Sequence, residues 1–255
     1  MDHLQELARL LDDAARQATA VEQIDPEGKL SLEQAYAIQA ESLALRGARG
    51  ERRVGVKMGF TSRAKMAQMG LSDVIWGRLT DAMRVEEGGT VDAARYVHAR
   101  AEPELAFVLG RPLPGDASAA EALAAVEAVA PAIEIIDSRY RDFRFTLTDV
   151  IADNASSSGF VIGPWSDPRG DFGNLGLALC IDGRPVQVGS TAAILGHPIR
   201  SLVAAARLAA AAGEPLQAGA IVMAGGATSA EWIKPGQYVS IEMERLGSAG
   251  FSVRE

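Results

Sequence analysis

Two glutamates separated by one residue mark the place in this sequence where ionic chemistry is expected. Glu102 and Glu104 stand at the start of an apolar run, 105–109, that has the length of a strand. Because side chains alternate between the two faces of a strand, both carboxylates would point to one side and the bulk of the apolar side chains to the other. The two acids therefore converge on one point, where a cation would compensate them.

A third glutamate, Glu134, lies in a segment where a solvent-exposed carboxylate is not expected. Glu134 lies between Ile133 and Ile135 in a segment, 131–136, that otherwise has the character of a buried strand. An uncompensated carboxylate there would cost several kcal/mol, so it requires a cation. One divalent ion would serve all three acids, and oxygen ligands without Cys or paired His favour Mg²⁺ or Mn²⁺ over Zn²⁺. The alternative for the Glu102 and Glu104 pair alone is a solvated strand edge.

Lys57 is a single cation in an apolar stretch, between Val56 and Met58 and flanked by glycines at 55 and 59. A lysine held in such a place can have a lowered pKa and act as a base, an acid or a Schiff-base amine. Its stem can equally cross apolar surface while the amine reaches water. The residues alone leave both interpretations open.

Three polar segments offer groups that could contact an anionic ligand. Segment 137–144 contains arginines, Arg139 among them, that could hold a carboxylate with two hydrogen bonds, although alternating charges also solvate loops. Segment 153–159, with Ser157, can cap a helix or donate to a ligand. The glycine turn 225–228, which ends at Thr228, could present backbone N–H groups to an anion.

Composition narrows the class of protein. The chain has 255 residues, 48% hydrophobic and 23% charged, as expected for a globular protein. Its net charge of -8 disfavours binding to nucleic acid or to an anionic membrane surface. The single cysteine, Cys180, has no partner for an internal disulfide, which suits a reducing cytoplasm. Neither a signal peptide nor a run of 18 apolar residues is present, so we expect a soluble cytoplasmic protein.

The elements that must position these residues form a helical front end and a mostly β body. Apolar spacing predicts helices over 4–18, 121–129 and 202–212, with a short helix over 62–69, and Ser31 with Gln34 forms a capping box for a helix to about residue 46. Asp182-Gly183 predicts a hairpin between strands 175–181 and 185–189. We therefore predict an α+β fold, with an N-terminal part, 1–75, that carries Lys57 and a β-rich catalytic domain, 76–255, that holds the metal site.

Motifs along nearly the whole chain resemble the 4-oxalocrotonate decarboxylases of the catechol meta-cleavage pathway. The matching segments are 55–62, 64–70, Glu102-x-Glu104, 134–140, 150–157, 195–198 and 225–226. The wider group includes 2-hydroxypentadienoate hydratases and fumarylacetoacetate hydrolases. Its members share a mixed β-roll, so the resemblance implies the fumarylacetoacetase C-terminal-like version of that fold.

The resemblance also implies a reaction, in which 2-oxo-3-hexenedioate, a small 2-oxo dicarboxylic acid, loses CO₂ to give 2-hydroxypenta-2,4-dienoate. Mg²⁺ or Mn²⁺ would be held by Glu102, Glu104 and Glu134, with Lys57 beside the developing enolate and without a Schiff base. The leaving carboxylate would lie near Leu71, Ile75 and Trp76, with further substrate contacts from Arg139, Ser157 and Thr228. Family members also imply a homo-oligomer and a complex with the hydratase.

Two alternatives to the decarboxylase remain at this point. The first is the sister hydratase, which uses the same metal site. Hydratases tend to carry an acid immediately before the aromatic-glycine pair that follows the lysine segment, whereas Ile75 precedes Trp76-Gly77 here. The second is a noncatalytic scaffold subunit of a decarboxylase-hydratase complex, although the presence of all four charged residues weighs against it.

Overall fold

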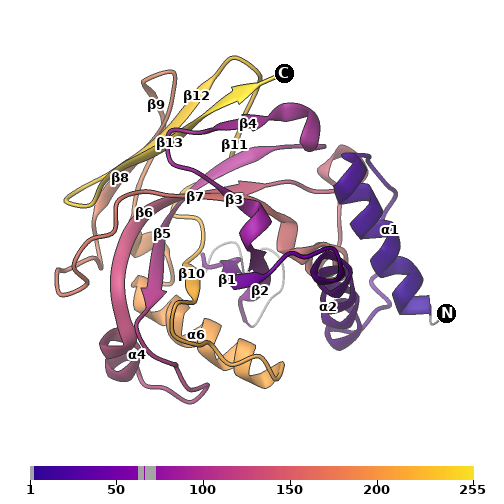
Figure 1. The fold of residues 1–255 in the computed structure, drawn as a ribbon, viewed down its shortest axis with the longest axis horizontal. Coiled ribbons are helices and arrows are strands. Elements are labelled where there is room, and N and C mark those ends of the chain that lie inside the picture. Colours follow the sequence, from indigo (N-terminus) through magenta and orange to yellow (C-terminus); the bar gives the residue numbers. More distant parts are fainter. Residues whose placement is uncertain (1–2, 63–65, 67–72) are drawn as a thin grey trace.

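A computed structural model describes residues 3–62, 66 and 73–255 of the chain. Two β-sheets form the body, and two N-terminal helices pack at one end of it (Figure 1). This arrangement confirms the predicted α+β fold with a small helical N-terminal part. The predicted helix over 62–69 and the predicted contact by Leu71 fall mostly or wholly outside the described residues.

The helices begin where the sequence places capping groups. The α-helices are α1 (His3–Gln17), α2 (Leu32–Ala48), α4 (Ala119–Ala125), α5 (Leu147–Ala152) and α6 (Pro198–Ala211). Ser31 caps α2 and Gln34 bonds back to it, so the predicted capping box is present. The short 3₁₀ turns are Asp81–Met83, Ala93–Arg95, Arg141–Phe143, Asn154–Ser156 and Thr191–Ala193.

The larger sheet contains the predicted site. Within the described residues it has 8 strands in the order β2-β1-β10-β5-β6-β7-β3, with β11 paired to β5. Its strands are β1 (Arg53–Gly59), β2 (Ile75–Thr80), β3 (Arg84–Val85), β5 (Arg100–Leu109), β6 (Val126–Ile136), β7 (Ser157–Ile162), β10 (Ile221–Met223) and β11 (Glu231–Trp232). Strands β5, β6 and β7 are antiparallel, whereas β1 and β10 run parallel.

The smaller sheet packs on the larger one through β12 and β13, which contact β6 (Figure 1). In the described part of the chain it has 5 strands in the order β4-β13-β12-β8-β9. These are β4 (Thr90–Asp92), β8 (Gly176–Ile181), β9 (Arg184–Ser190), β12 (Tyr238–Met243) and β13 (Gly247–Arg254). Asp182 and Gly183 both have positive φ, as the predicted two-residue hairpin turn requires.

One predicted helix was too long. The structure ends α4 at Ala125, and residues 126–129 begin β6 instead of continuing a helix. Val126 pairs with Leu109 and Val129 with Phe107, so the β-branched residues complete the ladder to β5. The predicted boundary between residues 75 and 76 stays a prediction. It lies at the start of β2, and strands on both sides of it belong to the larger sheet.

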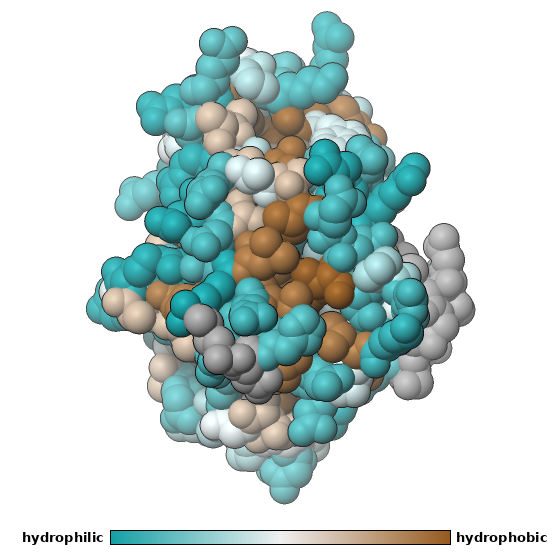
Figure 2. Space-filling view, turned by 90° about the vertical axis from the view of Figure 1, so that its right-hand side faces the viewer, coloured by the Kyte–Doolittle hydropathy of each residue, from teal (hydrophilic) through white to brown (hydrophobic). Residues whose placement is uncertain are grey.

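The face that carries α1 and α2 shows a band of hydrophobic side chains between hydrophilic flanks (Figure 2). Helix α1 buries Ala8 and Leu11 against α2, but Leu10 and Leu32 stay 43% and 51% exposed. The two helices therefore leave part of the apolar surface at this end uncovered. Among the described residues, no helix combines the length and the apolar character needed to cross a bilayer.

Candidate metal centre and active-site cavity

Strand pairing brings the three predicted carboxylates together. In the β5-β6 ladder, Glu102 is directly opposite Glu134, and Glu104 lies two residues further along the same face of β5. One carboxylate oxygen from each residue lies within 4.8 Å of the others. Glu104 and Glu134 are completely buried and Glu102 is partly buried, so the cluster lies at the inner end of an opening.

Lys57 reaches this cluster because the sheet curls. The strand order from Lys57 to Glu134 is β1, β10, β5, β6, which in a flat sheet would separate them by about 14 Å. The structure instead places Lys57 Nζ 3.0 Å from a carboxylate oxygen of Glu134. Lys57 also donates a hydrogen bond of 2.9 Å to the carbonyl oxygen of Ala155. The ammonium group is therefore held on two sides, with 3% of the residue exposed.

The carbonyl that holds Lys57 comes from a turn with unusual backbone geometry. Asn154, Ala155 and Ser156 have φ values of 52°, 51° and 60°, a left-handed conformation that non-glycine residues seldom adopt. The Asn154 side chain accepts a hydrogen bond from the backbone N–H of Arg78 and donates one to its carbonyl oxygen. The turn is thereby fixed to β2, and strain of this kind is typical of functional sites.

Two glycines let a loop approach the carboxylates closely. The backbone N–H of Gly225 donates a 2.7 Å hydrogen bond to Glu104, and a side chain there would collide with Thr61. A Cβ atom on Gly226 would lie 2.9 Å from an oxygen of Glu102. The predicted glycine turn thus contacts the acid cluster itself, through a backbone donor.

The electrostatics of the cluster reflect like charges buried together. Burial and the neighbouring Glu134 raise the pKa of Glu104 well above its usual value. Burial also raises the pKa of Glu134, while Lys57 opposes that rise. For Lys57, burial alone would lower the pKa, but Glu134, Glu104 and Glu102 outweigh it and raise the pKa above its usual value. The lowered lysine pKa considered from the sequence does not occur in this structure.

A cavity of about 510 Å³ opens beside Lys57 and Glu102. Its wall combines apolar and polar side chains from β1, β2, β5, β6 and α5, from the turn before β7 and from the loops after β1, β6 and β10. The lining residues are Lys57, Met58, Gly59, Phe60, Thr61, Ser62, Ile75, Arg100, Glu102, Ile136, Phe143, Phe145, Val150, Ala155, Ser156, Gly226, Ser229 and Ala230.

The predicted substrate residues fall into different places. Ile75 lines the cavity, but Trp76 points to the opposite face of β2, where it stacks on Tyr36 with ring centroids 5.8 Å apart. Ser157 donates a 2.7 Å hydrogen bond to Glu134 and so supports a carboxylate instead of facing the cavity. Thr228 is not among the lining residues; its hydroxyl bonds to the carbonyl oxygen of Ser229.

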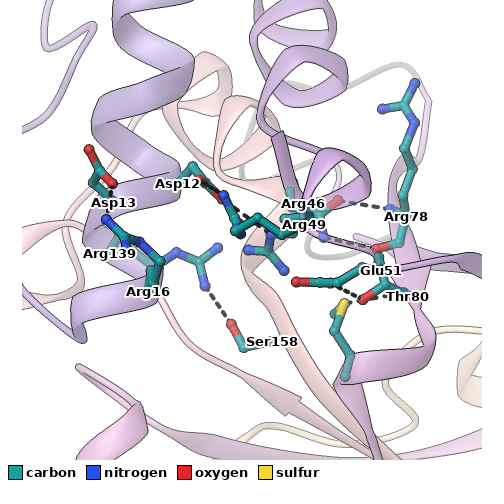
Figure 3. Close-up of polar contacts among 12 residues, drawn as sticks. Asp12, Asp13, Arg16, Arg46, Arg49, Glu51, Arg78, Thr80, Arg139 and Ser158 are labelled. Carbon is teal, nitrogen blue, oxygen red and sulfur yellow. Dashed lines mark hydrogen bonds and ion pairs between the residues drawn. The ribbon is translucent and has the colours of Figure 1, made fainter. Parts of the chain in front are cut away.

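Arg139 is also placed away from the cavity. It is 1% exposed and forms an ion pair with Asp153, to which both its backbone N–H and its guanidinium donate. Figure 3 shows its further contact with Ser158, on the side facing α1 and α2. All of these contacts are internal, so the predicted binding of a substrate carboxylate by Arg139 does not agree with its position.

Sequence patterns did not single out several of the cavity residues, and two of these bear directly on the chemistry. Arg100 lies two residues before Glu102, on the same face of β5, so the alternation that linked Glu102 to Glu104 could have included it. Ser156, and not Ser157, lines the cavity, and its hydroxyl oxygen is buried without a hydrogen-bond partner in the described structure. Only the left-handed turn, which has no clear sequence signature, distinguishes the two serines.

Comparison with known proteins agrees with this geometry. Residues 52–254 match the family described as fumarylacetoacetate hydrolase C-terminal. The chain is 58% identical, over 96% of both chains, to a 4-oxalocrotonate decarboxylase of a Pseudomonas species. It is 36% identical to a 2-keto-4-pentenoate hydratase of Paraburkholderia xenovorans, over 86% of this chain and 82% of that protein.

A solved structure shares almost the entire fold. It is the 4-oxalocrotonate decarboxylase of Pseudomonas putida G7 in complex with magnesium and adipate, with a TM-score of 0.94 and 36% identity over 98% of this chain and 97% of that one. The predicted mixed β-roll of the fumarylacetoacetase type is thereby confirmed. This chain belongs to the fumarylacetoacetate hydrolase C-terminal family, within the branch that contains the 4-oxalocrotonate decarboxylases and the related hydratases.

Proposed function

We propose that this protein is a metal-dependent carboxy-lyase that converts 2-oxo-3-hexenedioate into 2-hydroxypenta-2,4-dienoate and CO₂, in the degradation of aromatic compounds by meta-cleavage. The C5–C6 bond breaks, its electron pair moves through the conjugated alkene to the keto oxygen, and that oxygen takes a proton. The observation that carries the proposal is the buried cluster of Glu102, Glu104, Glu134 and Lys57 beside a cavity, in a chain 58% identical to a 4-oxalocrotonate decarboxylase.

The donor set fits Mg²⁺ or Mn²⁺. All three candidate ligands, Glu102, Glu104 and Glu134, are carboxylates, and one oxygen of Glu104 is buried without a hydrogen-bond partner among the described residues. Two fully buried carboxylates share one lysine, so the cluster retains negative charge for a cation to balance. When bound, such an ion supplies a Lewis acid that stabilises negative charge developing on the keto oxygen.

Lys57 supplies a fixed positive charge next to the same place. Its ammonium is held by Glu134 and by the carbonyl oxygen of Ala155, and the neighbouring glutamates outweigh burial and keep the pKa of Lys57 above its usual value. It can therefore stabilise the enolate oxygen or donate the proton that this oxygen takes. A protonated lysine is not a nucleophile, which agrees with a mechanism that has no Schiff base.

The wall of the cavity favours decarboxylation over the hydration carried out by the sister enzymes. Ile75 presents an apolar side chain at the position where hydratases tend to have an acid, and Phe60, Phe143 and Phe145 extend that apolar surface. These apolar side chains exclude water from that part of the wall and offer no group to activate a water molecule. We therefore place the leaving carboxylate beside Ile75, without a role for Trp76.

The test is to follow CO₂ and dienol from 2-oxo-3-hexenedioate with protein treated with EDTA and then resupplied with Mg²⁺ or Mn²⁺. We expect chelation to abolish CO₂ release and either ion to restore it. Glu104→Gln should lower kcat by about 1,000-fold, since it removes a buried ligand. Glu242→Gln, on the exposed face of β12, is the matched control and should keep full activity. Full activity in metal-free protein would refute the mechanism.

The remaining proposals concern assembly and location. We infer that the protein is a cytoplasmic homo-oligomer that associates with a 2-hydroxypentadienoate hydratase. The proteins related to this chain include both decarboxylases and hydratases, which supports this inference. The exposed apolar band at α1 and α2 supports a contact between chains (Figure 2). Light scattering of the protein alone and mixed with the hydratase would measure both assemblies, and a monomer in each sample would contradict them.

A further inference from the structure

Arg100 stands out in the cavity because its guanidinium packs on two aromatic rings while its buried Nε has no hydrogen-bond partner among the described residues. Its central carbon lies 3.9 Å from the ring centroid of Phe143 and 3.9 Å from that of Trp232, and the two rings meet edge to face at an angle of 69°. Contacts of this kind restrict the side chain, and a guanidinium has five N–H donors with which to reach a ligand.

The neighbouring acids leave this nitrogen without a partner. Glu102 and Glu231 are the acids whose charges act on Arg100, but neither accepts a hydrogen bond from its buried Nε. Glu231 instead accepts a 2.5 Å hydrogen bond from Gln187. A buried, unpaired guanidinium donor is costly, so a ligand that supplies two acceptor oxygens would relieve that cost.

The backbone that positions Phe143 has an unusual conformation. Phe143 and the preceding Asp142 both have φ of 57°, a left-handed conformation that is unfavourable for a bulky side chain. Trp232 is directly opposite Arg100 in the β11-β5 ladder. The guanidinium of Arg100 is therefore contacted by Phe143 from a loop and by Trp232 from the neighbouring strand β11.

The spacing matches the proposed substrate. Arg100 and Glu102 project from the same face of β5, about 7 Å apart along the strand. The two carboxyl carbons of a six-carbon dicarboxylate are roughly 6 Å apart in an extended chain, from five C–C bonds of about 1.5 Å. A substrate with one end at the acid cluster can therefore place its other carboxylate at Arg100.

We propose that Arg100, packed against Phe143 and Trp232, binds the carboxylate of the substrate that is remote from the metal cluster and so makes the site select dicarboxylic over monocarboxylic 2-oxo acids. This inference rests on the proposed function for the identity of the substrate. The contact binds the intact dicarboxylate but is lost as CO₂ forms, so it acts on substrate affinity. Ile75 supplies the apolar surface next to it.

The test compares adipate with hexanoate, its monocarboxylate of equal length, by calorimetry on the Mg²⁺-loaded protein. We expect the wild type to bind adipate at least about 10-fold more tightly, and Arg100→Gln to lose that preference while binding hexanoate normally. Arg184→Gln, at an exposed position on β9, should retain the preference. The KM for 2-oxo-3-hexenedioate should rise about 10-fold or more in Arg100→Gln without a fall in kcat, because a contact that is lost as CO₂ forms does not stabilise the transition state.

Either of two results would overturn the inference: a wild type with no preference for adipate, or an Arg100→Gln variant that keeps the preference. If that variant does not fold, Arg100→Lys decides the question, because a lysine cannot make the two-pronged contact and should weaken the preference. The decarboxylase proposal fails separately, if the wild type releases no CO₂ from 2-oxo-3-hexenedioate in the same preparation.

Discussion

The molecule buries two ionic clusters that differ in how completely their charges are matched. In the first, Lys57 shares its charge between buried carboxylates, and one oxygen of Glu104 accepts no hydrogen bond from the described residues. In the second, Arg139 and Asp153 pair one to one, and Arg139 donates further to the carbonyl oxygen of Asp153. Arg139 also donates to Ser158 (Figure 3).

The difference separates a site from a structural support. A buried pair that satisfies its own donors and acceptors gains nothing from a ligand, and its role is to hold β6 and the turn after α5 together. Among the described residues, the acid cluster has more buried carboxylates than lysines and an oxygen without a hydrogen bond, so a bound cation would stabilise it. Buried charge alone therefore does not identify an active site, whereas an imbalance of buried charge does.

Replacing the basic residue of each cluster, Lys57 or Arg139, with methionine tests this comparison. Lys57→Met should have the largest effect. We expect kcat for CO₂ release to fall by about 1,000-fold, because the charge beside the enolate oxygen is lost. The affinity for Mg²⁺, measured by calorimetry, should not weaken, since the variant retains Glu102, Glu104 and Glu134. The metal-free variant should melt at a lower temperature and recover on addition of Mg²⁺.

The matched control is Lys29→Met, because Lys29 is exposed and pairs with an exposed glutamate. It should keep both kcat and stability near the wild type. Wild-type turnover in Lys57→Met would return that lysine to a purely structural role and remove the distinction between the two clusters.

Arg139→Met should instead cost stability, by about 3 kcal/mol in the free energy of unfolding, because it leaves the buried Asp153 without its partner. Denaturation with urea measures this cost. Arg141→Met, two residues away on the surface, is the control and should change stability little. Soluble Arg139→Met with Mg²⁺ bound should keep most of its kcat, whereas a loss of kcat without a loss of stability would make Arg139 a site residue after all.

The destabilisation of Arg139→Met should depend on pH. Burial raises the pKa of Asp153 to about 6, and Arg139 limits that rise. Without Arg139 the folded-state pKa rises further, while the unfolded chain keeps an ordinary aspartate pKa near 4. The folded variant then binds a proton that the unfolded chain does not, so its stability increases as pH falls from 8 to 5. The difference from the wild type should therefore shrink at pH 5, and a constant difference would contradict the assignment.

Local patterns in the sequence predicted the features that depend on neighbouring residues. Alternation placed Glu102 and Glu104 on one face, and Asp182-Gly183 identified a hairpin that the structure contains. Tertiary curvature was not accessible in this way. The contact between Lys57 and Glu134 spans four strands of a curled sheet, and only the resemblance to a known family linked the two residues beforehand.

The errors also have physical causes. Arg139 and a substrate-binding arginine have the same sequence signature, and only the partner Asp153, 14 residues away, shows that its charge is already neutralised. Trp76 and Ile75 are adjacent in β2, so alternation sends just one of them to the cavity. The pattern of a short strand does not tell which side is the cavity side. Such choices are decided by packing between distant segments.

The smallest expected effect concerns a neutral residue that supports the first cluster. The hydroxyl of Ser157 donates a 2.7 Å hydrogen bond to Glu134 and so helps to orient one proposed ligand. Ser157→Ala should weaken Mg²⁺ binding about 10-fold, while kcat at saturating Mg²⁺ changes little. Ser156→Ala is the matched variant, because the hydroxyl of the neighbouring cavity residue Ser156 bonds to no described residue. It should leave the Kd for Mg²⁺ unchanged. Equal Kd values in the two variants would mean that Glu134 needs no support from Ser157, and that the acid cluster is held in place by its backbone alone.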